Sequence, residues 1–313
     1  MIIAVGVIVP TVAPPAGATP VLVHSVFVGG APDRVAIGPT GVWVGDLGHL
    51  ARVDPTTDRV VHVIGATTPI GVAPDQVWAG VFDRPDAVAR LDPTAARVVA
   101  RVDLGGSPAA IAIGFGAVWV LDSGAVLDRI DPTTDGVTAR VPLGGTEPAV
   151  APGEQLGALG FGVAVGAGAV WASGRSLDNR QAVLWRIDPT TYAVATSVTD
   201  ADCAALAGAT DAVWGACDTA RRVTAAAHVD TGADALDGIA VNGSSAWALG
   251  RRAVVTRLDA ASGQVLATYA APSGAEGIAA GGDAVWLAAP HLHEPSPAGG
   301  GTLLRLTAPG TGP

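Results

Sequence analysis

The stretch GSPAAIAIGFGAVWVLDSGAVLDRIDPTTDGVTARVPLGG, residues 106–145, decides the fold. It contains four short apolar runs separated by turn residues. Gly114-Phe115-Gly116 divides the first two runs, because glycine tolerates the positive φ that a tight hairpin needs. In the last turn, residues 131–136, Asp accepts backbone N–H groups, Pro presets φ and we expect Gly136 to supply the left-handed exit. Four strands that meander through about 40 residues are typical of one propeller blade.

Weaker copies of this unit run along the whole chain. Seven of the eight tryptophans follow Val or Ala at intervals of 33 to 52 residues: Trp43, Trp78, Trp119, Trp171, Trp214, Trp247 and Trp286. The Asp-Pro turn recurs at Asp54, Asp92, Asp131 and Asp188, and in degraded form at Asp259. Seven steps predict seven blades. Because a tryptophan buries roughly 150–250 Å², we expect these side chains between neighbouring blades.

The two ends of the chain complement each other. Residues 21–28 have the pattern of an outer strand with no preceding strands, and the last repeat stops after three strands. We therefore predict an all-β fold: a seven-bladed β-propeller of four-stranded antiparallel blades, in which the N-terminal strand completes the last blade and closes the ring. The propeller would form a single domain over residues 21–313, after a signal peptide or linker over residues 1–20.

The repeat resembles known families. Gly-x-Gly-Ala-Val-Trp-Val over residues 114–120, followed by Arg-Ile-Asp-Pro-Thr-Thr over 129–134, resembles the YVTN/YncE-like propellers. It is also similar to the streptogramin (virginiamycin B) lyase family, whose repeat has a Gly-Ile-Ala strand and a Trp-Phe-Thr-Glu strand. The resemblance covers about residues 21–313, and it implies the propeller fold. The lyase family implies in addition a Mg²⁺ site held by acidic residues and a His before Gly-Ile-Ala, a position that Asp237 and Glu276 occupy here.

The amino-acid composition limits the classes of partner that the protein could bind. Only 15% of residues are charged, the formal net charge is −10, and all the basic residues are arginine. This balance argues against nucleic acid as a partner, because phosphate binding needs a basic face. It is compatible with cations or basic partners.

Two features point to a compartment outside the cytoplasm. Residues 1–20 hold a short apolar run, a Pro/Ala linker and an Ala16-Gly17-Ala18 step that resembles a signal-peptidase site. We expect a clipped signal peptide or the stump of a membrane anchor from a larger parent protein, with a disordered tail as the alternative. Cys203 and Cys217 flank the hairpin at residues 209–211, so we predict a cross-strand disulfide, with two buried free thiols as the alternative. A secreted or cell-envelope protein is therefore expected.

Acidic residues recur where the first strands begin. Ten positions before the successive tryptophans of the repeat stand Asp33, Thr68, Ala109, Phe161, Ala204, Asp237 and Glu276. Because the last two blades and the first are neighbours in a closed ring, Asp33, Asp237 and Glu276 should converge at the channel mouth. Asp46 and Asp122, three positions after a Trp, are acidic as well. Clustered carboxylates indicate a Ca²⁺ or Mg²⁺ site, and the alternative is that they cap strands and face solvent.

A second group of candidates belongs to a ligand or partner surface. Trp185 stands outside the repeat register, in the slot of Asp128, next to a blade that carries an insertion at residues 146–159. An exposed Trp there would anchor a partner, whereas burial under the insertion is the alternative. The remaining candidates lie in long loops: Arg175, His291, His293 and Glu294. The two histidines are a weak zinc signal, because no third ligand is evident.

These observations favour an exported, monomeric, non-enzymatic propeller that binds a small ligand or a protein, as a sensor or scaffold. The alternative is a metal-dependent lyase acting on cyclic peptide lactones, as the resemblance to the streptogramin lyases implies. A third interpretation is a structural interaction module without a small-molecule site. The first predicts ligand effects without turnover, whereas the second requires a metal and a proton-transfer residue at the channel mouth.

Overall fold

The fold is described from a computed structural model. It covers residues 22–46, 48–81, 84–143, 160–175, 181–198, 202–217, 220–223, 227–229, 236–251, 254–272, 274–282, 284–290 and 301–307. Within them, the strands pair as seven four-stranded antiparallel sheets.

The first sheet contains β2 (Arg34–Gly38), β3 (Gly41–Gly45), β4 (Leu50–Asp54) and β5 (Arg59–Ile64). The second contains β6 (Thr67–Ala73), β7 (Gln76–Val81), β8 (Arg84–Asp92) and β9 (Arg97–Asp103). The third contains β10 (Pro108–Gly114), β11 (Ala117–Asp122), β12 (Val126–Asp131) and β13 (Gly136–Pro142). The fourth contains β14 (Gly160–Gly166), β15 (Ala169–Arg175), β16 (Ala182–Ile187) and β17 (Val194–Val198).

The fifth sheet contains β18 (Ala205–Gly208), β19 (Val213–Ala216), β20 (Ala220–Arg222) and β21 (Ala227–Val229). The sixth contains β22 (Leu236–Asn242), β23 (Ser245–Gly250), β24 (Val254–Asp259) and β25 (Val265–Ala270). The last contains β26 (Gly277–Gly281), β27 (Ala284–Ala289), β28 (Thr302–Thr307) and β1 (Leu22–Phe27).

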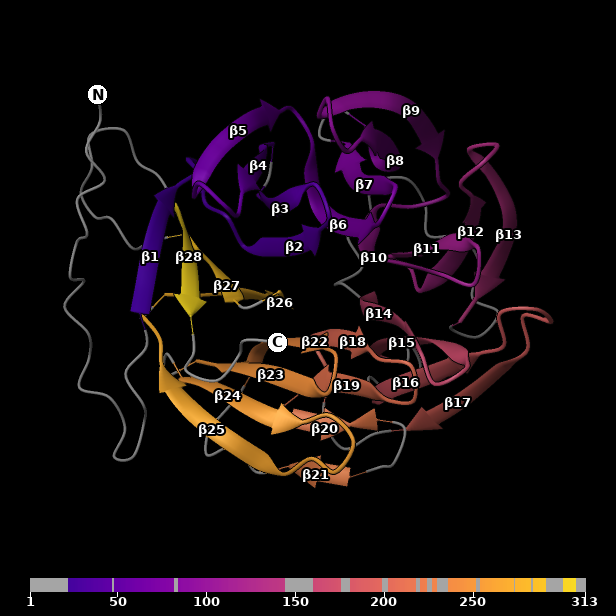
Figure 1. Ribbon diagram of the computed structural model, residues 1–313. Helices are drawn as coiled ribbons and strands as arrows, with labels where there is room; N and C mark the ends of the chain where they lie inside the picture. Colours follow the sequence, from indigo (N-terminus) through magenta and orange to yellow (C-terminus); the bar gives the residue numbers. More distant parts are fainter. Residues whose placement is uncertain are drawn as a thin grey trace.

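The sheets are arranged around a common centre (Figure 1). The first strand of each sheet lies innermost and contacts the first strand of the next sheet, and β26 contacts β2. The strand β1 pairs antiparallel with β28, with Val26 opposite Leu303, so the two ends of the chain share one sheet. The structure confirms an all-β propeller of four-stranded antiparallel blades and its closure by the N-terminal strand.

Tryptophans fill the interfaces between neighbouring sheets, as predicted. Six of them are buried in apolar clusters that also contain residues of the next sheet: Trp43, Trp78, Trp119, Trp214, Trp247 and Trp286. Trp171 is half-buried. These large side chains hold the sheets face to face, because their burial removes a large apolar area from water.

Each of these tryptophans has an arginine directly opposite on the third strand. The register pairs Trp43 with Arg52, Trp78 with Arg90, Trp119 with Arg129, Trp171 with Arg186, Trp214 with Arg222, Trp247 with Arg257 and Trp286 with Arg305. In four sheets the guanidinium carbon lies 5.4–6.0 Å from the indole centroid, within the range of a cation–π contact. A planar guanidinium suits this stacking better than an ammonium does.

Three of these arginines also reach the Asp-Pro turn of the next sheet. Arg52 donates to the Pro93 carbonyl at 2.7 Å, and Arg90 makes two hydrogen bonds with the Asp135 carboxylate at 2.7 and 2.8 Å. Arg305 of the last sheet donates to the Pro55 carbonyl of the first at 3.0 Å. The turns are therefore also attachment points between neighbouring sheets.

The turns themselves differ from the prediction in one respect. The Asp131 carboxylate accepts the Thr133 N–H at 2.8 Å, as expected. The left-handed residue, however, is Asp135 (φ 55°), so the prediction for Gly136 is wrong. In the equivalent turn of the second sheet, between β8 and β9, the N–H of Ala96 donates to the Asp92 carbonyl at 2.9 Å. This bond closes the turn at its fifth residue, which therefore takes the positive φ.

One carboxylate lies in the apolar interior. Asp128, in β12, is fully buried and faces the same side of its sheet as Ile130. Its Oδ1 lies 3.1 Å from Nε of Arg140, which is half-exposed. Burial raises the pKa of Asp128 from 3.8 to about 6, an effect that the positive charge of Arg140 partly offsets. The equivalent register positions of the other six sheets hold Ala51, Ala89, Trp185, Arg221, Thr256 and Leu304, so Asp128 is the one carboxylate at this position.

We predict that Asp128 makes stability depend on pH. Because its pKa is higher in the folded than in the unfolded chain, the folded state binds more protons between pH 4 and 6, and the free energy of unfolding falls as pH rises through this range. In the Asp128→Asn variant this fall should be smaller, and the variant should gain stability relative to wild type as pH rises from 4.5 to 7.5. Chemical denaturation of both proteins at several pH values measures the difference. Parallel pH curves would contradict the assignment.

Candidate functional site

A cavity of about 190 Å³ lies where the first strands begin. We call the residues that line it the channel mouth: Arg34, Val35, Pro69, Ile70, Ala109, Ala110, Ile111, Phe161, Gly162, Val163, Ala204, Ala205, Leu206, Asp237, Gly238, Ile239, Glu276, Gly277 and Ile278. Every sheet contributes to it. Five of the seven residues predicted for this position, Ala109, Phe161, Ala204, Asp237 and Glu276, are lining residues, whereas Arg34 and Pro69 line the cavity in place of their neighbours Asp33 and Thr68.

Backbone irregularities place these side chains. The register of the first strand shifts between Pro108 and Ala110, between Gly160 and Gly162, and between Leu236 and Gly238. Ala109, Phe161 and Asp237 are therefore the extra residues of β-bulges. A bulge kinks the strand and redirects a side chain, and bulges are frequent next to functional sites.

Glycines bring the inner strands close together. A Cβ on Gly238 would lie 2.7 Å from Cγ2 of Ile278, and one on Gly277 would lie 2.5 Å from the carbonyl oxygen of Asp33. Both distances are too short for a side chain, so these positions require glycine. The close approach gathers the strand starts that carry Asp237, Glu276 and Arg34 on one side of the mouth.

Most charges on this side are paired. Arg34 donates to the carbonyl of Asp33 at 3.1 Å and lies 3.6 Å from its carboxylate. Burial raises the pKa of Asp33, and the charge of Arg34 opposes that shift. Nε of Arg251 donates to Oδ1 of Asp237 at 3.1 Å. Glu276 is exposed, and its backbone N–H donates to the Ala288 carbonyl at 2.8 Å.

Asp237 and Glu276 both line the cavity and Asp33 lies against Gly277, so the three predicted carboxylates share one side of the mouth without forming a metal-ligand group. Among the residues that the structure describes, no three His, Cys, Asp or Glu side chains lie together in a group that could hold a metal ion. Asp33 and Asp237 face arginines instead. A multidentate Ca²⁺ or Mg²⁺ site, which needs several oxygen ligands, is therefore not formed by the candidate residues in this conformation.

The carboxylates of Asp46 and Asp122 accept hydrogen bonds from backbone N–H groups. Asp46 accepts the N–H groups of Ala31 at 2.5 Å and His49 at 3.0 Å, and Asp122 accepts that of Val126 at 2.7 Å. Burial is the main cause that raises the pKa of Asp122. Asp46 and Asp122 thus cap the backbone, as the alternative expected, but both are buried rather than facing solvent.

A glycine sixteen residues earlier makes room for each of these carboxylates. A Cβ on Gly30 would lie 1.8 Å from Oδ2 of Asp46, and one on Gly106 would lie 2.5 Å from Oδ2 of Asp122. The paired Gly and Asp therefore fix the segment that enters the sheet against the loop after its second strand. The sixteen-residue spacing between glycine and aspartate is visible in the sequence. That the two residues are in contact becomes clear only once the structure shows which loops lie next to each other.

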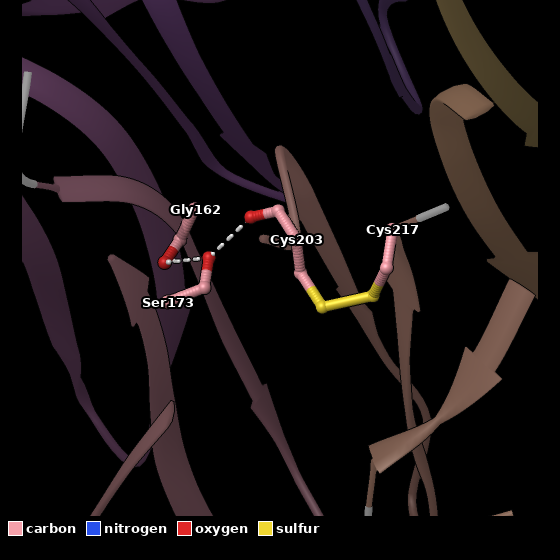
Figure 2. The surroundings of a disulfide bond; sticks show 4 residues. All are labelled: Gly162, Ser173, Cys203 and Cys217. Atoms are coloured by element: carbon pink, nitrogen blue, oxygen red, sulfur yellow. Dashed lines mark hydrogen bonds between the residues drawn. A yellow bond between two sulfur atoms is a disulfide. The ribbon is translucent and has the colours of Figure 1, made fainter. Parts of the chain in front are cut away.

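The predicted disulfide is confirmed, and it lies beside the channel mouth. Cys203 and Cys217 are joined by an S–S bond of 2.01 Å, and Ala204 next to Cys203 lines the cavity. As Figure 2 shows, the Ser173 hydroxyl of the fourth sheet points to the Cys203 carbonyl, to which it donates at 2.8 Å. The Leu236 N–H of the sixth sheet donates to the Cys217 carbonyl at 3.2 Å. The backbone carbonyls of the two bridged cysteines thus accept hydrogen bonds from the sheets on either side.

Of the predicted partner surface, only Trp185 and Arg175 lie within the described residues. Trp185 is 2% exposed and belongs to the apolar cluster between the third and fourth sheets, so of the two alternatives burial is the one found, and Trp185 is not an exposed anchor. Its register position points into that interface, where a large apolar side chain gains most by burial. Arg175 is exposed but forms a bidentate ion pair with Asp202. His291, His293 and Glu294 lie outside the described residues, as does the insertion at 146–159.

Sequence reasoning missed two arginines of this site. Arg34 follows the predicted position by one residue, and Arg251 stands after β23. Repeat alignment singles out neither of them, because it identifies equivalent positions rather than ion pairs. Their pairing with Asp33 and Asp237 decides which charge at the mouth stays uncompensated.

Comparison with known proteins supports the fold. Similar solved structures include the hydrazine synthase of Kuenenia stuttgartiensis (14% identity, TM-score 0.65, 85% of this chain and 94% of that one). They also include the WD40 repeats of RRP9 (8%, 0.66, 91% and 97%) and the β-propeller domain of Myceliophteria thermophila Cps50 (Swd1) (9%, 0.65, 92% and 100%). At such low identity the likeness shows the fold alone.

No family model and no curated protein matches the chain. The resemblance to YVTN/YncE-like propellers and to streptogramin lyases therefore stays a prediction. Within the described residues, no helix has the length and apolarity that a membrane crossing would need.

We predict that the disulfide is needed for the stability of the fifth sheet, whose strands are only three or four residues long. Replacing both cysteines, Cys203→Ser with Cys217→Ser, should lower the free energy of unfolding by about 2–4 kcal/mol. Chemical denaturation measures this loss. Dithiothreitol should destabilise the wild type by a similar amount and leave the double variant unchanged; equal stability of wild type and variant would contradict the prediction.

Proposed function

We propose that this chain is a seven-bladed, ligand- or protein-binding β-propeller that acts as a sensor or scaffold and catalyses no reaction. The observation that carries the proposal is the channel mouth. All the sheets contribute lining residues to one cavity, and these residues combine apolar walls with a few charged groups. Small-ligand sites usually have this composition.

The surrounding structure supports a binding role. The mouth residues stand at the starts of strands that a closed ring fixes in place, and sites on rigid elements hold their geometry better than sites on loops. WD40 repeats and a β-propeller domain are among the similar solved structures. A propeller fold hosts many functions, so the site rather than the fold indicates the binding role.

We further propose that the protein works in an oxidising compartment, secreted or in the cell envelope. The disulfide between Cys203 and Cys217 supports this location, because disulfides persist mainly outside the cytosol. The clipped signal peptide that we expect over residues 1–20 would deliver the protein there.

The binding role is tested by filling the cavity. Ala109 is a small lining residue, so an Ala109→Trp substitution should occupy the mouth. Asp75→Trp, at the exposed hairpin between β6 and β7 on the opposite face, is the matched control. Thermal unfolding of all three proteins is followed with a panel of metabolite-sized compounds and short peptides. A compound at a hundredfold excess over its Kd adds about 2.7 kcal/mol of stability.

We expect at least one compound to stabilise the wild type and the control but not Ala109→Trp. Hits that stabilise all three proteins equally, or no hit at all, would contradict the mouth as a binding site. Turnover of a hit by the wild type would contradict the non-enzymatic role.

A further inference from the structure

We infer that the channel mouth binds a single ammonium group on an aliphatic stem, as in a primary alkylamine. This inference rests on the proposed binding function and specifies its ligand class. Three features of the cavity support it: the distribution of charge around it, its uncharged opposite wall and its size.

One carboxylate of the mouth is uncompensated. Arg34 is held by Asp33 and Arg251 by Asp237, so these four charges cancel in pairs. Glu276, whose strand packs directly against the start of β2, makes no side-chain hydrogen bond or ion pair with any residue that the structure describes. Counting only the described residues, the side of the mouth formed by the last, first and sixth sheets therefore carries a net charge of −1, which attracts a monovalent cation.

The opposite wall is uncharged. The second to fifth sheets contribute to the cavity only apolar residues and a glycine: Pro69, Ile70, Ala109, Ala110, Ile111, Phe161, Gly162, Val163, Ala204, Ala205 and Leu206. A fully hydrated inorganic ion gains nothing from such a wall. A cation with an apolar stem gains from both sides, because the stem leaves water while the ammonium pairs with Glu276.

The size of the cavity limits the ligand. Its volume of about 190 Å³ is below the range of roughly 300–1,000 Å³ that holds drug-sized ligands. A stem of about four carbons with one ammonium matches this space. A divalent metal is disfavoured, because it needs several oxygen ligands and the described residues offer no suitable group of three.

The same chemistry occurs in a free alkylamine and in the side chain of lysine, so the test uses both. The probes are n-butylammonium and Nα-acetyl-lysine N-methylamide, with methylammonium and 1-butanol as controls for the stem and the charge. Binding to the full-length chain is measured by calorimetry at low salt. The variants are Glu276→Gln and, as a matched loss of one exposed carboxylate on the opposite face, Asp75→Asn.

We expect n-butylammonium to bind the wild type and Asp75→Asn equally, and Glu276→Gln at least tenfold more weakly. Methylammonium should bind more weakly than n-butylammonium, by about fourfold for each missing methylene, and 1-butanol should not bind. A Phe161→Ala variant should reduce this dependence on stem length. Binding of the lysine amide as well would identify a lysine-bearing partner as the source, whereas binding of n-butylammonium alone would identify a free amine.

The inference is overturned if neither amine binds, or if Glu276→Gln and Asp75→Asn weaken binding equally, since that would indicate only the overall negative charge. Its failure is distinct from failure of the binding function. A compound of another class that stabilises the wild type but not Ala109→Trp would keep the mouth as a binding site and reject only the alkylammonium class.

Discussion

The contact between a tryptophan and the arginine opposite it holds the molecule together. The tryptophan lies between two sheets, and the arginine covers it from the third strand. In three sheets the same arginine extends to the Asp-Pro turn of the next sheet, as Arg90 does to Asp135. Arg305 makes this contact from the last sheet to the first. Apolar burial supplies the attraction between sheets, and the arginine fixes their relative position.

This arrangement gives the channel mouth its shape. With the sheets fixed around the centre, glycines such as Gly277 let the inner strands approach closely, and bulges turn Phe161 and Asp237 toward the cavity. The result is a small space with an apolar wall on one side and charged strand starts on the other. The disulfide lies at the same end of the sheets, where the shortest strands need reinforcement.

The sequence was sufficient for the propeller and for its closure, because both depend on strongly periodic turns and apolar runs. It also predicted the disulfide, and five of the seven positions predicted for the mouth line the cavity. The sequence could not decide whether the carboxylates form a metal site. Spacing shows which carboxylates lie at the same end of the sheets, but it does not show that Asp46 accepts backbone N–H groups or that Asp237 pairs with Arg251. Likewise, the burial of Trp185 depends on the interface that it faces, which composition does not reveal.

The account is tested most directly by the coupling between Arg90 and Asp135, which belong to neighbouring sheets. A double-mutant cycle compares the free energies of unfolding of wild type, Arg90→Leu, Asp135→Asn and the double variant. If the arginines fix the sheets against each other, the two residues should be coupled by about 1 kcal/mol or more, in line with a two-pronged ion pair. A coupling energy indistinguishable from zero would mean that apolar burial alone positions the sheets, and would contradict the account.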